Sequence, residues 1–250
     1  AKNDPAMTSS DLVLENEKLR AQLKILGDTP IIPFPEEESV VEKKMTDTEI
    51  LIALSRAAND PNPITRSQVF SDLLEKLNPE NLEAVLEVYQ NMPMGFESMH
   101  EYRLLMYAWG KFDAPSAIEY VNGRNLGRGG AFAATGAMEG WASQNPQAAI
   151  EWNKAQENQR AAKIYNFGIV RGLASHDVTQ AADYVTTLED GWEKSRMVGV
   201  LTSQFLKEGF SSARNWAENL EDENFKASAF SNLSRQQARD NPNEVAAWLK

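Results

Sequence analysis

Few residues of this 250-residue sequence have the types and spacing that catalysis or metal binding requires. Cysteine is absent, which excludes disulfides, thiolate metal sites and a cysteine nucleophile. The two histidines, His100 and His176, lie far apart in the chain and form no His-x-x-x-His pair. Motifs for a serine nucleophile, a nucleotide phosphate or a dinucleotide do not occur in the sequence. We therefore expect no catalytic residue, no bound metal and no cofactor.

Two polar patterns remain as candidates for chemistry. Gly123–Gly130 is rich in glycine and arginine and precedes a predicted helix start, where an anion can bind. It does not follow a strand and has no Lys-Ser/Thr pair, so a loop between helices is the preferred interpretation. The acidic pairs Glu189–Asp190 and Glu221–Asp222 recur 32 residues apart, which indicates favourable charges at helix starts rather than a catalytic pair.

Composition and charge limit the class of protein. The apolar fraction of 42% is typical of a globular chain, and the formal net charge of −11 argues against a general nucleic-acid binder. No apolar run reaches the roughly 18 residues of a membrane helix, so we expect no membrane span in this chain. The chain begins with Ala1, so either a preceding segment has been removed or extra residues stand before Met7. We favour a membrane tether upstream and a body outside the cytoplasm, although a cytoplasmic location fits as well.

Residues 1–26 predict a short coiled-coil helix. Apolar residues and one asparagine alternate at spacings of four and three, as the a and d positions of a heptad do. These positions are Leu12, Asn16, Leu19, Leu23 and Leu26. Two asparagines at an a position pair across the axis of a parallel dimer, so we expect homodimerisation through this helix. The alternative is an amphipathic helix that packs on its own body.

Residues 27–45 predict a linker between this helix and the rest of the chain. Pro30, Pro33 and Pro35 forbid a continuing helix, and three glutamates follow them. The apolar residues among them could dock on the body or on a partner, but a semi-rigid spacer is the preferred interpretation.

Beyond about residue 96 the sequence repeats with a period of 32 residues. Positions 32 residues apart share a residue type, and we call each such series a column: one column is polar, one holds small residues and one is aromatic. Their members are Asp113, Asn145, Asp177, Gly209 and Asn241; Ala117, Ala149, Ala181, Ala213 and Val245; and Tyr120, Trp152, Tyr184, Trp216 and Trp248. A fourth column contains Trp109, Trp141, Leu173 and Phe205. Four columns in one register indicate repeated structural units.

The polar column marks helix starts, because Asp, Asn and Gly are common N-caps. Pro146 and Pro242 follow their caps directly, at the first helical position, where proline loses no hydrogen bond. Each cap thus begins a helix B, whose small and aromatic columns must be buried, and each helix B follows a longer helix A, such as 130–143. Asp190 and Glu193 have the spacing of a capping box and predict the start of another helix A.

Helix A has one core column and two columns of small residues. The core column is Leu105, Ala137, Ile169, Leu201 and Leu233, and the small residues are Gly136 and Gly168 in one column and Ala108, Gly140 and Gly172 in the other. Glycine inside a helix costs roughly 1 kcal/mol relative to alanine, so its recurrence needs a reason. We predict that the missing side chains let a neighbouring helix approach closely; contact with a ligand is the alternative.

Residues 46–95 predict three further helices whose spacing departs from the 32-residue repeat by about one helical turn, as is common for terminal repeats. We expect them over Asp47–Ala58, over Thr65–Leu77, and from Asn78–Pro79 onward with an apolar stripe of Leu82, Val85, Leu86 and Tyr89. No segment alternates with period two, so the sequence predicts an all-α protein.

Residues 140–155 read Gly-Trp-Ala-Ser-Gln-Asn-Pro-Gln-Ala-Ala-Ile-Glu-Trp-Asn-Lys-Ala and resemble the helix junction of a tetratricopeptide (TPR) repeat. That family's small residue in helix B falls on Ala149, and its aromatic falls near Trp152. The period is 32 residues rather than about 34, and the resemblance covers roughly residues 96–250, so we describe the repeat as TPR-like and expect one helical solenoid over residues 46–250. The resemblance implies a right-handed α-solenoid of stacked helix pairs that acts as a non-enzymatic scaffold for a protein or peptide partner.

The variable face of helix A is the candidate binding surface. Residues two before the core column and two before the column of Trp109 lie about 200° away around the helix. They form the columns Arg103, Thr135, Phe167, Gly199, Ser231 and Tyr107, Glu139, Arg171, Ser203, Arg235. Their chemistry changes from repeat to repeat while the core does not, which indicates a surface free to specialise.

We therefore expect a partner, such as an acidic peptide, to contact this face. The candidate contact residues are Arg103, Tyr107, Glu139, Phe167, Arg171 and Arg235. Plain solvated surface is the alternative for this face. For the whole chain, the alternative is an enzyme or small-ligand carrier with a pocket in the curve of the solenoid.

Overall fold

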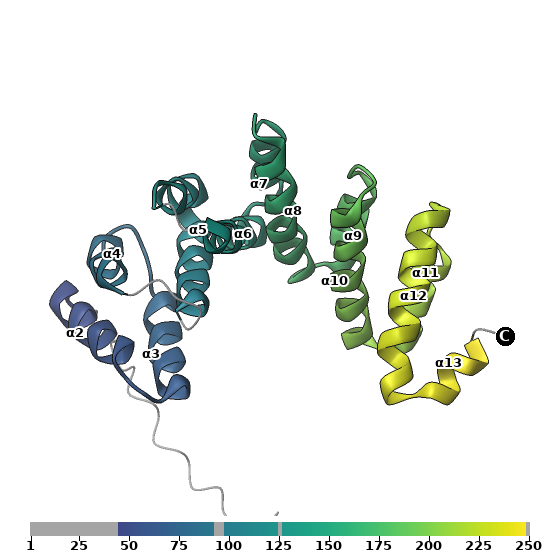
Figure 1. Ribbon diagram of the computed structural model, residues 1–250, viewed down its shortest axis with the longest axis horizontal. Coiled ribbons are helices and arrows are strands. Elements are labelled where there is room, and N and C mark those ends of the chain that lie inside the picture. The colour runs from purple at the N-terminus through teal and green to yellow at the C-terminus, as the bar shows by residue number, and fades with distance from the viewer. Residues whose placement is uncertain (1–44, 93–97, 125–126, 249–250) are drawn as a thin grey trace, which may run out of the picture. The chain divides into compact units, whose positions relative to one another are not determined.

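The computed structural model describes residues 45–92, 98–124 and 127–248. The chain divides into two units, Ala1–Lys44 and Met45–Lys250, and the described residues belong to the second. All regular secondary structure in them is helical (Figure 1). The helices are α2 (Asp47–Ala58), α3 (Pro63–Glu75), α4 (Leu82–Asn91), α5 (Met99–Gly123), α6 (Gly127–Gln144), α7 (Pro146–Lys154), α8 (Gln159–Ala174), α9 (Val178–Thr186), α10 (Trp192–Glu208), α11 (Phe210–Glu218), α12 (Glu223–Asp240) and α13 (Pro242–Trp248). The prediction of an all-α protein is confirmed for this part of the chain.

Helix B begins where the polar column predicts. Asn145 Oδ1 accepts a hydrogen bond from the Ala148 N–H at 3.2 Å, and α7 follows with proline at its first position. Asp113 has φ −154° and ψ 76°, so it breaks α5 into a helix A and a helix B. Its Oδ1 accepts from the Ser116 N–H at 3.2 Å, as an N-cap does. Gly209 has φ 119°, a left-handed conformation that glycine adopts without strain.

The capping box predicted for the start of α10 does not form. We expected a capping box of Asp190 and Glu193, but α10 begins at Trp192 after Gly191, and no side chain caps it. The Asp190 carboxylate instead accepts from Lys194 Nζ at 2.9 Å. The Asp190 carboxylate therefore pairs with a side chain in the first turn of α10 and does not cap the helix.

The first three helices follow the predicted order with shifted bounds. The bounds of α2 agree with the prediction, and α3 begins two residues early because Asn62 caps it through the Ile64 N–H. The third helix does not begin at Pro79. The side chains of Asn78 and Asn81 accept from the Glu80 and Asn78 N–H groups at 2.9 Å, forming a turn that delays α4 until Leu82.

The predicted columns form the core. Leu105, Ala137, Ile169, Leu201 and Leu233 are all fully buried, and the small-residue column of helix B is buried throughout. The aromatic column is only partly as predicted. Tyr184 is buried, whereas Trp152 and its other equivalents are half-buried and pack on the edge of the core.

Glycines join successive A helices backbone to backbone. A Cβ built on Gly136 would lie 2.8 Å from the carbonyl oxygen of Arg103 in the preceding helix A. Four further glycines approach neighbouring backbone still more closely: Gly110 faces Ala137, Gly140 faces Tyr107, Gly168 faces Thr135 and Gly172 faces Glu139. We call Gly110, Gly136, Gly140, Gly168 and Gly172 the glycine seam. It joins α5, α6 and α8 and confirms the predicted packing role of the recurrent glycines.

The seam ends at α8. At the next step of 32 residues, Val200 and Gln204 of α10 replace Gly168 and Gly172. Side chains therefore separate α8 from α10. Helices in close contact are neighbours or next-but-one neighbours along the chain, such as α6 with α7 and α8 (Figure 1). Among the described residues, no helix has the length and apolar character that crossing a membrane needs.

Candidate functional site

A groove of about 430 Å³ lies on the helix A face where the glycine seam ends. Residues of α6, α8 and α10 line it, with aromatic and arginine side chains set among small or aliphatic residues. The lining consists of Phe132, Phe167, Trp192, Arg171 and Arg196, with Ala131, Thr135, Ile164 and Val200 between them. We call it the arginine–aromatic groove.

The aromatic side chains of the groove are unusually accessible. Trp192 is 60% exposed and Phe132 is 42% exposed, and large apolar side chains gathered at one place commonly mark a binding surface. The Phe167 and Trp192 rings lie 6.4 Å apart between centroids with their planes at 34°. The guanidinium carbon of Arg196 lies 5.8 Å from the Phe167 centroid and 5.6 Å from that of Trp192. Cation–π contacts therefore position Arg196 and leave the edge of its guanidinium for a ligand.

An ion-pair chain crosses three helices beside the groove. Arg103 Nη2 donates to Glu139 Oε2, and Arg171 Nη1 lies 3.9 Å from the same oxygen. Arg103 also lies over the Phe132 ring at 5.8 Å. Its buried Nε donates to no acceptor among the described residues. The glycine seam makes this chain possible, because it brings the backbones of α5, α6 and α8 together.

The local charge of the site is opposite to that of the chain. Arg103 and Arg171 share a single glutamate, Glu139, Arg196 has no carboxylate partner among the described residues, and the groove lining itself contains no acidic residue. The whole chain has a formal net charge of −11. The groove thus offers guanidinium donors and aromatic faces, which suit a ligand carrying both carboxylates and an apolar side chain.

The structure brings together four of the six predicted contact residues. Arg103, Glu139 and Arg171 form the ion-pair chain, and Phe167 lines the groove. Tyr107 lies outside the groove lining, and Lys111 Nζ covers its ring at 4.9 Å.

Arg235 is also absent from the groove lining; on α12 its Nη2 donates to Ser231 Oγ at 3.5 Å. Thr135, which was expected at the surface, is 9% exposed, and its hydroxyl donates to the Phe132 carbonyl at 2.6 Å. The predicted dimerisation residues fall outside the described part of the chain: Leu12, Asn16, Leu19, Leu23 and Leu26.

Sequence reasoning missed Phe132, Trp192 and Arg196. Phe132 and Arg196 share a column with Ile164, three residues before the column of Thr135 and Phe167. Residues three apart lie on one helix face, so this third column was available from the spacing alone. Trp192 has Arg160 and Asn224 as its equivalents, which shows that its aromatic ring is not part of the repeated core.

Neither histidine contributes to a site in the structure. His100 and His176 are both exposed, and among the described residues no group of three or more His, Cys, Asp or Glu could hold a metal ion. The basic end of the glycine-rich segment is partly engaged, since Arg124 Nη1 donates to the Tyr120 hydroxyl at 2.5 Å. No protein-family model, characterised protein or solved structure matches this chain.

Proposed function

We propose that the chain is a non-enzymatic interaction scaffold, a TPR-like solenoid that binds a protein or peptide partner in the arginine–aromatic groove. One observation carries this proposal: three successive A helices each contribute an aromatic ring to one groove above a regularly repeated core, two of these rings are exposed, and α8 and α10 add an arginine each. The order of helix contacts, which joins only near neighbours in the chain, supports a stacked repeat.

The partner that fits the groove is an extended acidic segment with one large apolar side chain. Its apolar side chain would pack on Phe132, Phe167 and Trp192, and its carboxylates would pair with Arg171 and Arg196. Arginine forms two parallel hydrogen bonds with a carboxylate, which favours acidic over neutral segments. Aromatic residues and arginine are also the usual energetic centres of interfaces.

The test is a selection of peptides from a random displayed library on the full chain, followed by fluorescence anisotropy of the selected peptides. We expect acidic peptides with an aromatic or aliphatic residue. Trp192→Ala with Arg196→Ala should weaken binding by more than tenfold, about 1.4 kcal/mol. Both side chains are exposed, so melting should hardly change. Phe112→Ala with Arg160→Ala is the matched control, because both residues are exposed and neither lines the groove.

Two outcomes would contradict the proposal. The selection could enrich no peptide at all, or the selected peptides could bind the groove variant and the control variant equally well. Turnover of a selected peptide or of a small molecule, lost in the groove variant, would favour an enzyme instead.

A further inference from the structure

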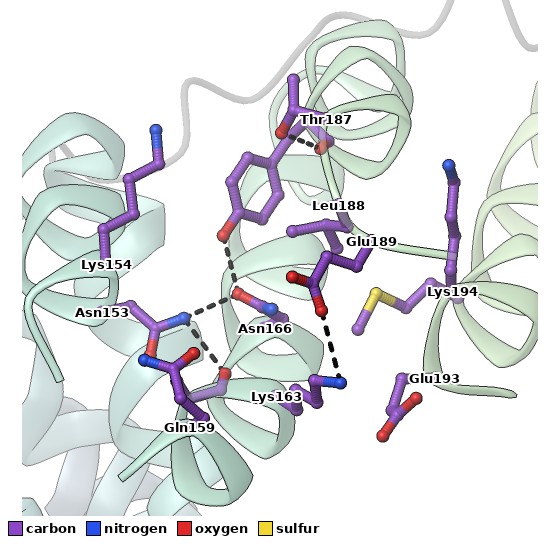
Figure 2. Close-up of a pocket in the computed structure, with 13 residues that line it drawn as sticks. Asn153, Lys154, Gln159, Lys163, Asn166, Thr187, Leu188, Glu189, Glu193 and Lys194 are labelled. Carbon is purple, nitrogen blue, oxygen red and sulfur yellow. Dashed lines mark hydrogen bonds and ion pairs between the residues drawn. The ribbon is translucent and has the colours of Figure 1, made fainter. Parts of the chain in front are cut away.

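A second, polar cavity of about 290 Å³ lies between the end of α7, α8, the end of α9 with its following loop, and the start of α10 (Figure 2). Its polar lining residues are Asn153, Lys154, Gln159, Lys163, Asn166, Tyr184, Thr187, Glu189, Glu193 and Lys194, and Ala162, Leu188 and Met197 complete it. It shares no lining residue with the arginine–aromatic groove.

The repeat pattern breaks at this cavity. The equivalents of Asn153 at the 32-residue step are Val121, Val185 and Ala217, all buried. The equivalents of Asn166 are Tyr102, Ala134, Val198 and Phe230. Only at this repeat do two amides occupy positions that elsewhere hold aliphatic or aromatic residues. A buried amide with an unmade hydrogen bond costs about 1–3 kcal/mol, so packing alone does not explain why asparagines stand at these two positions.

The two asparagines form a network whose orientation is fixed. Asn153 Nδ2 donates to the Ala162 carbonyl at 3.1 Å and to Asn166 Oδ1 at 2.6 Å. The Tyr184 hydroxyl donates to the same Asn166 oxygen at 2.7 Å. A carbonyl only accepts, so Asn153 must present its nitrogen, and Asn166 must then present its oxygen to both donors.

Two hydrogen-bonding groups of this network remain unused. Asn166 Nδ2 donates to no acceptor among the described residues. Asn153 is 3% exposed, and its buried Oδ1 accepts from no described donor. The network therefore leaves one donor free beside the cavity and one acceptor unpaired inside its wall. Figure 2 shows both side chains in the wall of the cavity, beside Gln159 and Lys163.

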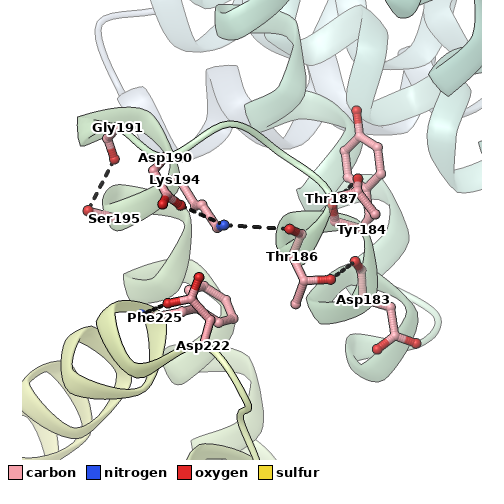
Figure 3. Close-up of polar contacts among 10 residues, drawn as sticks. All are labelled: Asp183, Tyr184, Thr186, Thr187, Asp190, Gly191, Lys194, Ser195, Asp222 and Phe225. Carbon is pink, nitrogen blue, oxygen red and sulfur yellow. Dashed lines mark hydrogen bonds and ion pairs between the residues drawn. The ribbon is translucent and has the colours of Figure 1, made fainter.

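One charged residue of the cavity, Lys194, makes a contact that recurs in the next repeat. Lys194 Nζ bonds to Asp190 at 2.9 Å and to the Thr186 carbonyl at the end of α9 (Figure 3). Its equivalent Lys226 donates to the Glu218 carbonyl at the end of α11. This lysine therefore links helix B to the next helix A in two repeats and has a structural role.

The charges of Lys154 and Glu193 recur only at the far ends of the repeated region, and that of Lys163 does not recur. The equivalents are Asn122, Thr186, Glu218 and Lys250 for Lys154; Met99, Ala131, Ser195 and Ala227 for Lys163; and Glu97, Gly129, Ala161 and Phe225 for Glu193. Lys163 pairs loosely with the exposed Glu189 at 3.5 Å. Lys154 and Glu193 form no ion pair within the described ranges. They come from α7 and α10 on different sides of the cavity (Figure 2).

We propose that this cavity binds a small carboxylate that also carries a hydrogen-bond donor, an amino acid or a hydroxy acid. The carboxylate pairs with Lys163 and accepts from Asn166 Nδ2, and Lys154 adds positive charge at the opposite wall. The amino or hydroxyl group lies toward Glu193. The volume of about 290 Å³ lies at the small end of ligand pockets, which suits a molecule of this size.

The test measures binding of defined probes to the full chain by calorimetry and by thermal shift. The probes are glycine, L-serine, L-glutamate and L-lactate; acetate lacks the donor, and ethanolamine lacks the carboxylate. We expect at least one probe to bind tenfold more tightly than acetate and ethanolamine. Lys154→Ala with Lys163→Ala should weaken that binding by at least tenfold. Lys207→Ala with Arg239→Ala, two exposed cations away from the cavity, should leave it unchanged.

A second variant tests the network itself. Asn153→Val and Asn166→Val introduce the residues of the next repeat, Val185 and Val198, and Tyr184→Phe removes the hydroxyl that would lose its acceptor, so melting should stay near that of the native chain while probe binding is lost. Equal binding by this variant would place the probe elsewhere and overturn the proposal. Failure of every probe to bind at up to about 10 mM would do the same and would leave the network a purely structural one.

Discussion

Gly172 lies against the backbone of Glu139, one repeat earlier in the chain: a Cβ built on Gly172 would lie 2.5 Å from the Glu139 carbonyl oxygen. The same approach brings the Glu139 carboxylate to 3.9 Å from Arg171 Nη1, on the residue next to that glycine. The contact that excludes a side chain from the core therefore also assembles the charges beside the groove. In this protein, packing and the candidate site depend on one helix spacing.

Replacing Gly172 by alanine should destabilise the fold. The added methyl would also meet Ala142 Cβ at 2.7 Å and the Ser143 nitrogen at 2.9 Å, so α6 and α8 must separate. We expect a loss of about 1–3 kcal/mol in urea denaturation, despite the better helix propensity of alanine. Gly129→Ala is the control, since the nearest group to its Cβ is Met99 Cε at 3.9 Å, and it should be neutral or stabilising. Equal stability of the two variants would show that the seam is not tight.

A buried ion pair near the first helices gives a second prediction. Arg66 Nε donates to Glu101 Oε1 at 3.0 Å, and the Glu101 side chain is only 3% exposed. Arg66→Ala leaves a buried carboxylate without its partner, so we expect a loss of about 2–4 kcal/mol in the free energy of unfolding. Glu101→Met in the same background removes the unpaired charge and should recover much of it. No recovery would mean that Arg66 acts through packing alone.

The tyrosine of the polar cavity should make stability depend on alkaline pH. Burial raises the pKa of Tyr184 from 10.0 to about 12. The pKa of Tyr184 is therefore higher in the folded than in the unfolded state. Its contribution to the free energy of unfolding is complete below pH 10 and disappears as the pH rises from 10 to about 12.

Tyr184→Phe isolates this effect. At pH 8 the variant should be less stable by about 1 kcal/mol, because the hydrogen bond to Asn166 is lost. Between pH 10 and about 12 the native chain should lose stability faster than the variant, so the difference shrinks or reverses. Parallel curves over that range, measured by denaturation at each pH, would contradict the assignment.

Self-association through the N-terminal helix stays a prediction from the sequence. Leu19→Lys with Leu23→Lys puts charges at two heptad core positions. We expect the native chain to sediment as a dimer at tens of micromolar and this variant as a monomer. Glu15→Lys is a milder control at a flanking position. A monomeric native chain, or a variant that is still dimeric, would exclude the coiled coil.

Periodicity predicted the core because each core position is repeated. Leu105 and its equivalents, the caps at Asn145 and Asp177, and the seam glycines other than Gly110 recur, so one packing reason explains several residues at once. Periodicity does not predict which of two polar partners a side chain binds. Asp190 has cap spacing, but its carboxylate bonds to Lys194 instead, a choice that depends on where the α9 terminus lies.

The site was predicted only in part, for a related reason. The two variable columns led to Arg103, Phe167 and Arg171, but Trp192 belongs to neither column. Its role depends on the packing of α10 beside α8, which brings its ring to 6.4 Å from that of Phe167 between centroids. Asn153 and Asn166 were also passed over, although their positions in apolar columns were visible in the sequence. Departures from a repeat are as informative as the repeat itself.

The end of the glycine seam has a consequence for how the chain opens. Backbone in direct contact leaves little room for a partial separation, so amide hydrogens of α6 and α8 should exchange with solvent only in large openings. Beyond Gly172, side chains hold α10 against α8, and smaller openings can expose its amides. The groove spans this boundary. A partner bound across the groove would hold α10, whose amides exchange quickly, against α6 and α8, whose amides exchange slowly. Protection from exchange would therefore rise most in α10.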